Sequence, residues 1–206
     1  VGADSLQANT TGAQNTAVGQ QALQNNTTAS GSTAVGRNAL GSVTTATNCV
    51  AVGENAGDAK STGDSIVAIG RNCLTDATGD NNTAVGTNAG ANIVGGSNNT
   101  CIGHYSGMLY STANCTYVGH LSGYNSSGDN NTALGQGALN GAGGSNNMCL
   151  GYSATTSAGD SANQITLGNA SITTLRCADT SIQSLSDRRD KTDIVDLPVG
   201  LDFINK

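Results

Sequence analysis

Large apolar and aromatic side chains are scarce in this chain. Its 206 residues include no Trp, one Phe and one Pro, and only 11% of the residues are charged. A conventional globular core needs many large apolar side chains, so an ordinary compact domain is excluded over most of the length. Disordered chains of low hydrophobicity are usually rich in charge and Pro, and both are scarce here. We therefore expect an ordered fold with a thin core.

Basic stripes and long apolar runs are also missing. The formal net charge is −6, which argues against a nucleic-acid partner. No apolar run approaches 18 residues, so we expect no membrane insertion. No nucleotide-binding loop, metalloprotease motif or paired metal-ligand spacing occurs, and we expect no cofactor and no bound metal. The sequence opens on Val1-Gly2 without an initiator Met, and we expect it to be a fragment of a longer protein.

A glycine recurs along the chain at intervals of 16 or 17 residues. A fixed period this short indicates stacked coils, each too small to fold alone. The sequence therefore predicts an all-β parallel solenoid, or β-roll, over residues 1–168. The recurring glycines, called the closing glycines below, are Gly2, Gly19, Gly36, Gly53, Gly70, Gly86, Gly103, Gly119, Gly135, Gly151 and Gly168.

Each closing glycine is preceded by an aliphatic residue, and usually by Ala one position earlier, as in Thr33-Ala34-Val35. Alternation with β-branched residues predicts a strand of four or five residues at this point. We expect the aliphatic side chain to point into the coil and the Ala to face a close neighbour outside it. The residues after the glycine, such as 37–40, predict a second short strand. A polar loop rich in Gly, Ser, Thr, Asn and Asp then completes the coil.

Stacking in register would bring equivalent residues of successive coils side by side, about 4.8 Å apart. Arg37, Glu54 and Arg71 would form a ladder of alternating charge. His104 and His120 occupy equivalent places in adjacent coils and should stack. An Asn also recurs before the strand position, and it predicts a ladder of side-chain amides. Such a ladder satisfies the hydrogen-bonding groups at buried edges and discourages slips of register between coils. Its members are Asn15, Asn82, Asn99 and Asn131.

The segment Ser65-Ile66-Val67-Ala68-Ile69-Gly70 is similar to the head repeat of trimeric autotransporter adhesins. In that family each chain forms a left-handed parallel β-roll, and three rolls pack around a threefold axis. The resemblance implies a homotrimeric fibre whose subunits meet at the Ala column. A triple β-helix of three interwound chains is the alternative.

The composition changes near the end of the chain. Residues 169–185 lose the repeat and suggest a connector. From Ser186 onward, nine of the last 21 residues are charged, against 13 in the first 185, and Pro198 and Phe203 are the only Pro and Phe. We interpret residues 186–206 as the truncated start of a second, conventional domain.

Residues 185–194 together with 201–205 resemble the opening of the endosialidase-type intramolecular chaperone, a self-cleaving peptidase family found at the C-terminus of phage tail fibres and tailspikes. The resemblance implies that Ser186 is the nucleophile, that Lys191 is its general base, and that cleavage falls between Ser186 and Asp187. A Lys of lowered pKa can take the hydroxyl proton, so the chemistry needs no His. A capping segment without chemistry is the alternative, and we expect no activity from the truncated chain.

The Tyr and His residues all fall between positions 104 and 152. Aromatic side chains exposed on a polar shaft suit a carbohydrate or receptor, and surface decoration at a tolerant position is the alternative. The binding candidates are His104, Tyr105, Tyr117, His120 and Tyr124. We expect the cysteines to be small apolar substitutes within the repeat, with disulfides as the alternative; they are Cys49, Cys73, Cys101, Cys115, Cys149 and Cys177.

Together these features predict a structural, adhesive fibre on a virion surface or outside the cell: a viral or phage tail-fibre stalk for host attachment, whose trimerisation a C-terminal chaperone assists. A host-cell receptor or glycan would be its partner. A cellular trimeric surface adhesin is the second hypothesis. A self-cleaving Ser-Lys autoprotease, with itself as substrate, is the third.

Overall fold

A computed structural model describes residues 1–58, 63–108 and 111–176. The chain divides into two compact units, Val1–Ile172 and Thr173–Lys206. The first unit holds the repeats. Most of the predicted connector and the whole predicted chaperone segment lie outside the described residues.

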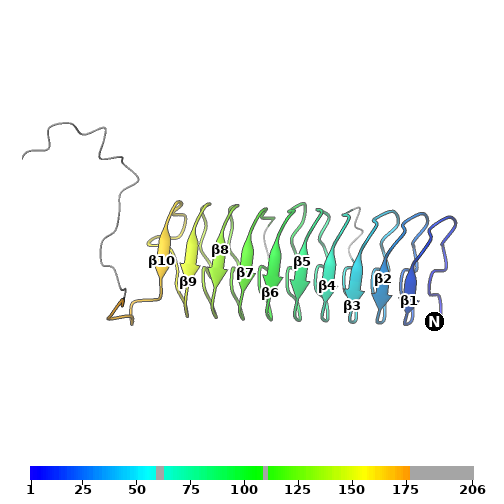
Figure 1. Ribbon diagram of the computed structural model, residues 1–206, viewed down its shortest axis with the longest axis horizontal. Coiled ribbons are helices and arrows are strands. Elements are labelled where there is room, and N and C mark those ends of the chain that lie inside the picture. Colours follow the sequence, from blue (N-terminus) through cyan, green and yellow to red (C-terminus); the bar gives the residue numbers. More distant parts are fainter. Residues whose placement is uncertain (59–62, 109–110, 177–206) are drawn as a thin grey trace, which may run out of the picture. The chain divides into compact units, whose positions relative to one another are not determined.

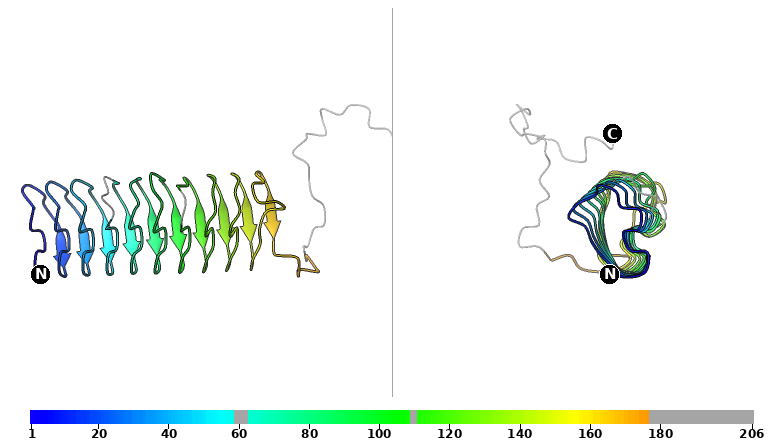
Figure 2. Two further views of the ribbon diagram at one scale, coloured as in Figure 1. Left: turned by 180° about the vertical axis from the view of Figure 1, so that it is seen from behind. Right: turned by 90° about the vertical axis from the view of Figure 1, so that its right-hand side faces the viewer.

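The first unit is a parallel β-solenoid, as the glycine period predicts (Figures 1 and 2). One three-residue strand ends immediately before each closing glycine from Gly19 onward. The strands form a single sheet in sequence order, and viewed along the axis the coils nearly superimpose (Figure 2). The strands are β1 (Thr16–Val18), β2 (Thr33–Val35), β3 (Val50–Val52), β4 (Val67–Ile69), β5 (Thr83–Val85), β6 (Thr100–Ile102), β7 (Thr116–Val118), β8 (Thr132–Leu134), β9 (Met148–Leu150) and β10 (Ile165–Leu167).

Each strand pairs with the next strand of the same chain in strict register. Ala17 lies beside Ala34, and Val18 beside Val35. The change between 17- and 16-residue coils leaves this register intact, because the difference is absorbed in the loops. Pairing within one chain makes this a single-chain solenoid and not an interwound triple β-helix. Nine strand intervals give a sheet about 43 Å long.

The expected orientation of the strands is wrong. The Ala at the centre of each strand is the residue that points into the coil: Ala34, Ala51 and Ala68 are fully buried. The aliphatic residue that follows points outward, and Ile69 is 39% exposed. In most coils the space inside the strand is filled by a small side chain, Ala or Cys, and only in β7 does a large ring, that of Tyr117, point inward. The Ala column is therefore core, and it cannot be the contact between subunits that the family resemblance implied.

The larger core side chains come from the turn after the closing glycine. Leu23, Leu40, Leu74 and Leu139 occupy equivalent positions there and are fully buried. A buried Ala or Cys precedes each of these leucines. One Leu and several small residues thus form the core of such a coil, which explains how so few large apolar residues suffice.

Where this Leu is replaced by Gly, another side chain supplies the missing volume. A Cβ on Gly57 would lie 3.3 Å from Cδ1 of the buried Ile66, and one on Gly90 would lie 3.1 Å from Cδ1 of Ile93. Tyr117 occupies the space above Gly107 and Gly123 in the same way. Each coil therefore keeps a nearly constant core volume, as close packing requires.

The predicted second strand is wrong; a tight turn follows the closing glycine instead. Its second residue has left-handed φ, near 59° at Asn38 and 54° at Asn55, and its fourth does too, near 50° at Leu40. Alternating left-handed residues cannot form an extended strand. Asn tolerates this conformation better than most residues, which accounts for much of the Asn content.

The closing glycines leave no room for a side chain. Gly70 has φ near +133°, and a Cβ there would lie 2.6 Å from the carbonyl oxygen of Gly86, the next closing glycine. The same arrangement recurs in successive coils. Glycine is required because both the backbone conformation and the close approach of the next coil exclude a Cβ.

The predicted amide ladder is confirmed in part: Asn82 and Asn99 are adjacent, whereas Cys115 separates Asn99 from Asn131 and Ser32 follows Asn15. Asn82 and Asn99 lie in the core immediately before a strand. The Oδ1 of Asn82 accepts hydrogen bonds from the backbone N–H and the side-chain amide of Asn99, both at 3.0 Å. The Oδ1 of Asn99 in turn accepts from the N–H of Cys115 at 3.0 Å. Asn131 and Asn147 continue the pattern. These bonds satisfy backbone groups at the strand ends that would otherwise be buried without partners.

Replacing Gly70 with Ala should destabilise the solenoid by about 3–5 kcal/mol, because backbone strain adds to the clash with Gly86. Urea unfolding followed by far-ultraviolet circular dichroism measures the effect. Gly159→Ala is the matched control, since a Cβ there meets nothing within 4 Å, and it should change the stability by less than about 1 kcal/mol. Equal losses in the two variants would contradict the steric explanation.

Asn99→Ala should cost about 3 kcal/mol, since it leaves the N–H of Cys115 and the carbonyl of Thr112 without a partner in the core. Asn98→Gly is the comparison, because Asn98 is exposed and its φ of 61° suits Gly; we expect a change of a few tenths of a kcal/mol. The same urea titration compares them. A similar small loss in both variants would mean that the buried ladder contributes little.

Candidate functional site

The outward face of the sheet carries two uncharged columns, which together we call the outer face. The first residue of each strand forms one column, mostly Thr with some Val, Met and Ile, and the last forms the other, which is Val, Ile or Leu throughout. Six of the ten residues in the aliphatic column are 38–51% exposed, and the rest are partly exposed. None of the twenty positions is charged. A flat apolar face of this regularity is unusual on a polar shaft.

Four of the five predicted binding residues form an aromatic cluster at the turns that follow Gly103 and Gly119. The rings of His104 and His120 stack with centroids 5.4 Å apart and planes within 8°, as their equivalent positions predict. His104 also contacts Tyr105 at 4.1 Å, and Tyr105 meets Tyr124 edge-on at 6.1 Å. Both His residues are exposed and both Tyr residues are partly exposed. We call these four residues the aromatic cluster.

Tyr117, the fifth candidate, does not belong to this surface. It takes the place of Ala in β7 and is 1% exposed. A Cβ on Gly123 would lie 2.6 Å from its Cε1 atom, so the ring fills the space that a Leu fills in other coils. The prediction of a binding role is wrong for Tyr117. The alignment to the closing glycine, which places it at a core position, could have revealed this once the Ala column was known to face inward.

The described cysteines behave as small core residues, as expected. Cys49, Cys73, Cys101, Cys115 and Cys149 are buried and unpaired. Burial raises the pKa of the Cys73 and Cys101 thiols from 9.0 to about 12. It also raises the pKa of the Tyr117 phenol, with the neighbouring Cys115 and Cys101 adding to the effect. Raised thiol pKa values and burial make these groups poor nucleophiles.

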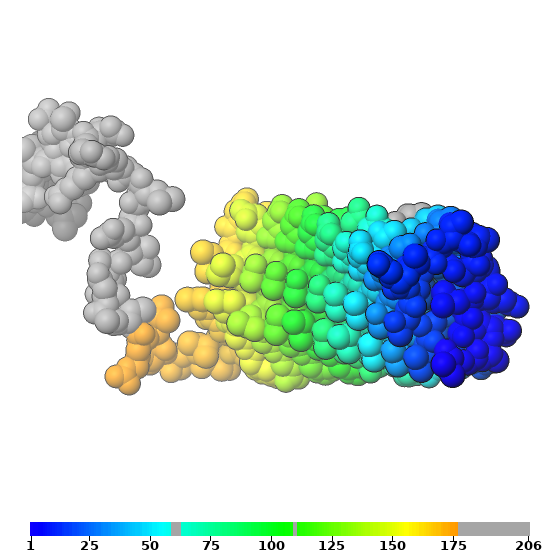
Figure 3. Space-filling model, turned by 45° about the vertical axis from the view of Figure 1, so that its right-hand side comes forward, coloured from blue at the N-terminus to red at the C-terminus, as the bar shows by residue number. Residues whose placement is uncertain are grey.

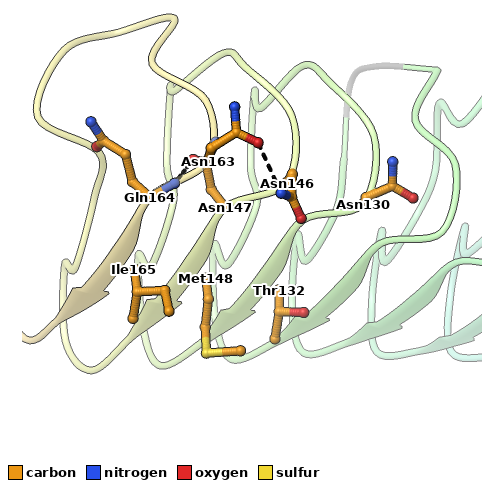
Figure 4. A pocket seen from close by; sticks show the side chains of 8 residues that line it. All are labelled: Asn130, Thr132, Asn146, Asn147, Met148, Asn163, Gln164 and Ile165. Atoms are coloured by element: carbon orange, nitrogen blue, oxygen red, sulfur yellow. Dashed lines mark hydrogen bonds between the residues drawn. The ribbon is translucent and has the colours of Figure 1, made fainter. Parts of the chain in front are cut away.

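A shallow groove of about 270 Å³ lies near the C-terminal end of the solenoid (Figure 4). An amide row forms one side, where the side chain of Asn146 donates to Oδ1 of Asn163 at 2.9 Å. Thr132, Met148 and Ile165 of the outer face form the other side (Figure 4). None of the residues that line the groove is charged, so it offers amide and hydroxyl groups for hydrogen bonds beside apolar side chains.

The predicted catalytic pair, Ser186 and Lys191, lies outside the described residues, as does Cys177. Among the described residues, no group of three or more His, Cys, Asp or Glu side chains could hold a metal ion. The ion pair predicted at the start of the charge ladder is present between Arg37 and Glu54. Both side chains are about half exposed, so the pair contributes little to stability.

The buried thiols predict a loss of stability at alkaline pH. The pKa of Cys101 is about 12 in the folded chain and 9.0 without burial, so its contribution is complete below pH 9 and is lost as pH rises from 9 towards 12. Each such group adds about 1.4 kcal/mol per pH unit to the slope in that range. Urea unfolding of the wild type and of Cys101→Ala between pH 8 and 11 should show a shallower decline in the variant. Parallel declines would contradict the assignment.

No family model matches the chain, and no curated protein or solved structure matches it. Within the described part of the chain, no helix is long and apolar enough to cross a membrane. The candidate sites therefore rest on the geometry of the solenoid alone: an uncharged outer face that runs its length, and one aromatic cluster at its side.

Proposed function

We propose that this chain is the shaft of a homotrimeric surface fibre, of the viral or phage tail-fibre type, that serves host attachment. The outer face is the observation that carries the proposal. A column of exposed aliphatic side chains along all ten strands needs a partner surface of the same length. In this assembly the outer faces, and not the Ala columns, turn towards the threefold axis.

Energetic estimates support self-association that is favourable but not excessive. Full burial of a Val, Leu or Ile side chain contributes about 1.5–3 kcal/mol, so covering the exposed part gives about 1 kcal/mol for each of ten coils. A trimer covers the outer faces of three chains, a gain of about 30 kcal/mol, and its two association steps together cost about 8–30 kcal/mol in lost freedom and ordering. The gain equals or exceeds the cost, and a domain that brings three chains together would aid assembly. The resemblance of residues 185–205 to an intramolecular chaperone fits this requirement.

A second copy is the partner that the outer face suits best. The side chains of the outer face repeat about every 4.8 Å along the axis, and those of a second copy repeat with the same period. Two such faces can interdigitate along their whole length, whereas a globular partner would match only a few coils. Closed symmetry is also the usual form of homo-oligomers.

The biological setting follows from the same features. A stiff, polar shaft with few charges suits the surface of a virion or an extracellular location, where it would present a receptor-binding surface. The resemblance of the terminal segment to a tail-fibre chaperone favours a virus or phage. A cellular trimeric adhesin shares the repeat, and a membrane-anchoring domain after the shaft in the full gene would favour that origin instead.

Sedimentation equilibrium tests the assembly. The wild-type chain should show a mass three times 20.4 kDa, and Val52→Asp combined with Ile69→Asp should shift it towards a single chain, because two charges per subunit would be buried at the axis. A wild-type mass of one folded chain would refute the trimer.

The matched control adds two charges outside the outer face. Gln20→Asp with Gln136→Asp places them on exposed residues directly after closing glycines, and this variant should remain trimeric. Circular dichroism establishes that both variants keep the solenoid. If the control dissociates as readily as the Val52/Ile69 variant, general charge repulsion and not the outer face accounts for the effect.

A further inference from the structure

The aromatic cluster is the part of the surface that folding explains least. Tyr105 has φ near 57°, a left-handed conformation that favours Asn or Gly. Equivalent positions in the four preceding coils are Asn38, Asn55, Asn72 and Asn88. Because Tyr105 is partly exposed, its side chain contributes less to the core than a buried side chain would. Gln21 and Leu121 adopt the same conformation at the equivalent position, so the aromatic ring, and not the backbone, is what distinguishes Tyr105.

We propose that His104, Tyr105, His120 and Tyr124 form a binding platform for a neutral carbohydrate. This inference deepens the attachment role proposed above and rests on it. The rings present apolar faces together with imidazole nitrogens and phenolic hydroxyls at their edges. Sugars combine an apolar C–H face with hydroxyl groups, so rings with polar edges can stack on the face and hydrogen-bond the hydroxyls.

The surroundings select for an uncharged ligand. No Lys or Arg occurs between Arg71 and Arg176, and Asp129 is the only acidic residue between Asp80 and Asp160. The carboxylate of Asp129 accepts a hydrogen bond from the N–H of Ala113 at 2.8 Å. The nearest Arg in the row is Arg71, two coils before His104, so a sialylated or sulfated glycan stacked on the cluster itself would find no permanently cationic partner beside it. A neutral glycan loses nothing by the absence of charge.

The repeat also sets the length of the ligand. The residues directly after the closing glycines form an exposed row, and His104 and His120 continue in it to Gln136 and Tyr152. Three coil intervals make this row about 14 Å long. Figure 3 shows the coils as successive bands along the solenoid surface, so an extended ligand can lie across several of them. The platform therefore suits an oligosaccharide better than a single sugar.

A glycan array tests the proposal. It should carry linear neutral oligosaccharides of glucose, galactose, mannose and N-acetylglucosamine, with sialylated and sulfated counterparts. The wild-type chain should bind at least one series of neutral oligosaccharides, and it should bind the sialylated and sulfated counterparts no more tightly. Titration calorimetry with the retained oligosaccharide then measures the affinity. The variant His104→Gln, His120→Gln, Tyr105→Asn should bind at least tenfold more weakly.

These substitutions are chosen to preserve the fold. Gln already occurs directly after two other closing glycines, Gly19 and Gly135, and Asn suits the φ of residue 105 better than Tyr does. Arg37→Gln with Glu54→Gln is the matched control, since it makes two changes to Gln in the same row but away from the cluster. The control should bind like the wild type. An equal loss in the control would overturn the assignment to the aromatic cluster.

Other outcomes separate this inference from the proposed fibre. A trimeric wild-type chain that retains no neutral glycan overturns the platform and leaves the fibre standing. A monomeric chain that binds neutral glycans through these residues supports the platform and refutes the trimer. If the wild-type chain binds charged glycans alone, the inference is overturned. The inference is also overturned if the triple variant binds the neutral glycan as tightly as the wild type does.

Discussion

The contact between successive closing glycines is the constraint on which the rest of the structure depends. Backbone lies directly against backbone there, with no side chain between, so the coils stack at the spacing of a parallel sheet. That spacing puts every equivalent residue of adjacent coils within reach of its neighbour. The amide contacts, the stacked His pair and the straight columns of the outer face all follow from it.

The narrow interior is the second consequence of the same contact. With the backbone held close, the strand directs a small side chain inward in most coils, with Tyr117 of β7 as the exception, and the aliphatic residue beside it faces outward. The chain thus leaves much of its β-branched surface uncovered on one side. These exposed side chains are why the outer face is central to the proposed assembly.

The sequence allowed the period, the position of every strand, part of the Asn ladder and the His stack to be predicted, because each of them depends only on spacing. It did not allow us to predict which residues of each strand point into the coil. Alternation in Thr33-Ala34-Val35 shows that two faces differ, and size alone suggested that Val is the core residue. Only the cross-section of the whole coil, with Leu40 entering from the turn, shows that the space behind Ala34 is already filled.

The placement of Tyr117 shows the same limit and has a further consequence. Its ring covers Gly123 in its own coil and Gly107 in the preceding one, so the two coils share one space-filling group. Coils that fill this space with their own Leu, such as the one that holds Leu23, are modules that need no neighbour's side chain there, whereas Leu40 also reaches Gly57 of the next coil. A gene could lengthen or shorten the shaft by duplicating or deleting those modules one at a time. Around Tyr117 a duplication or deletion must include both coils that share its ring, so the length of the shaft there changes by two coils at a time.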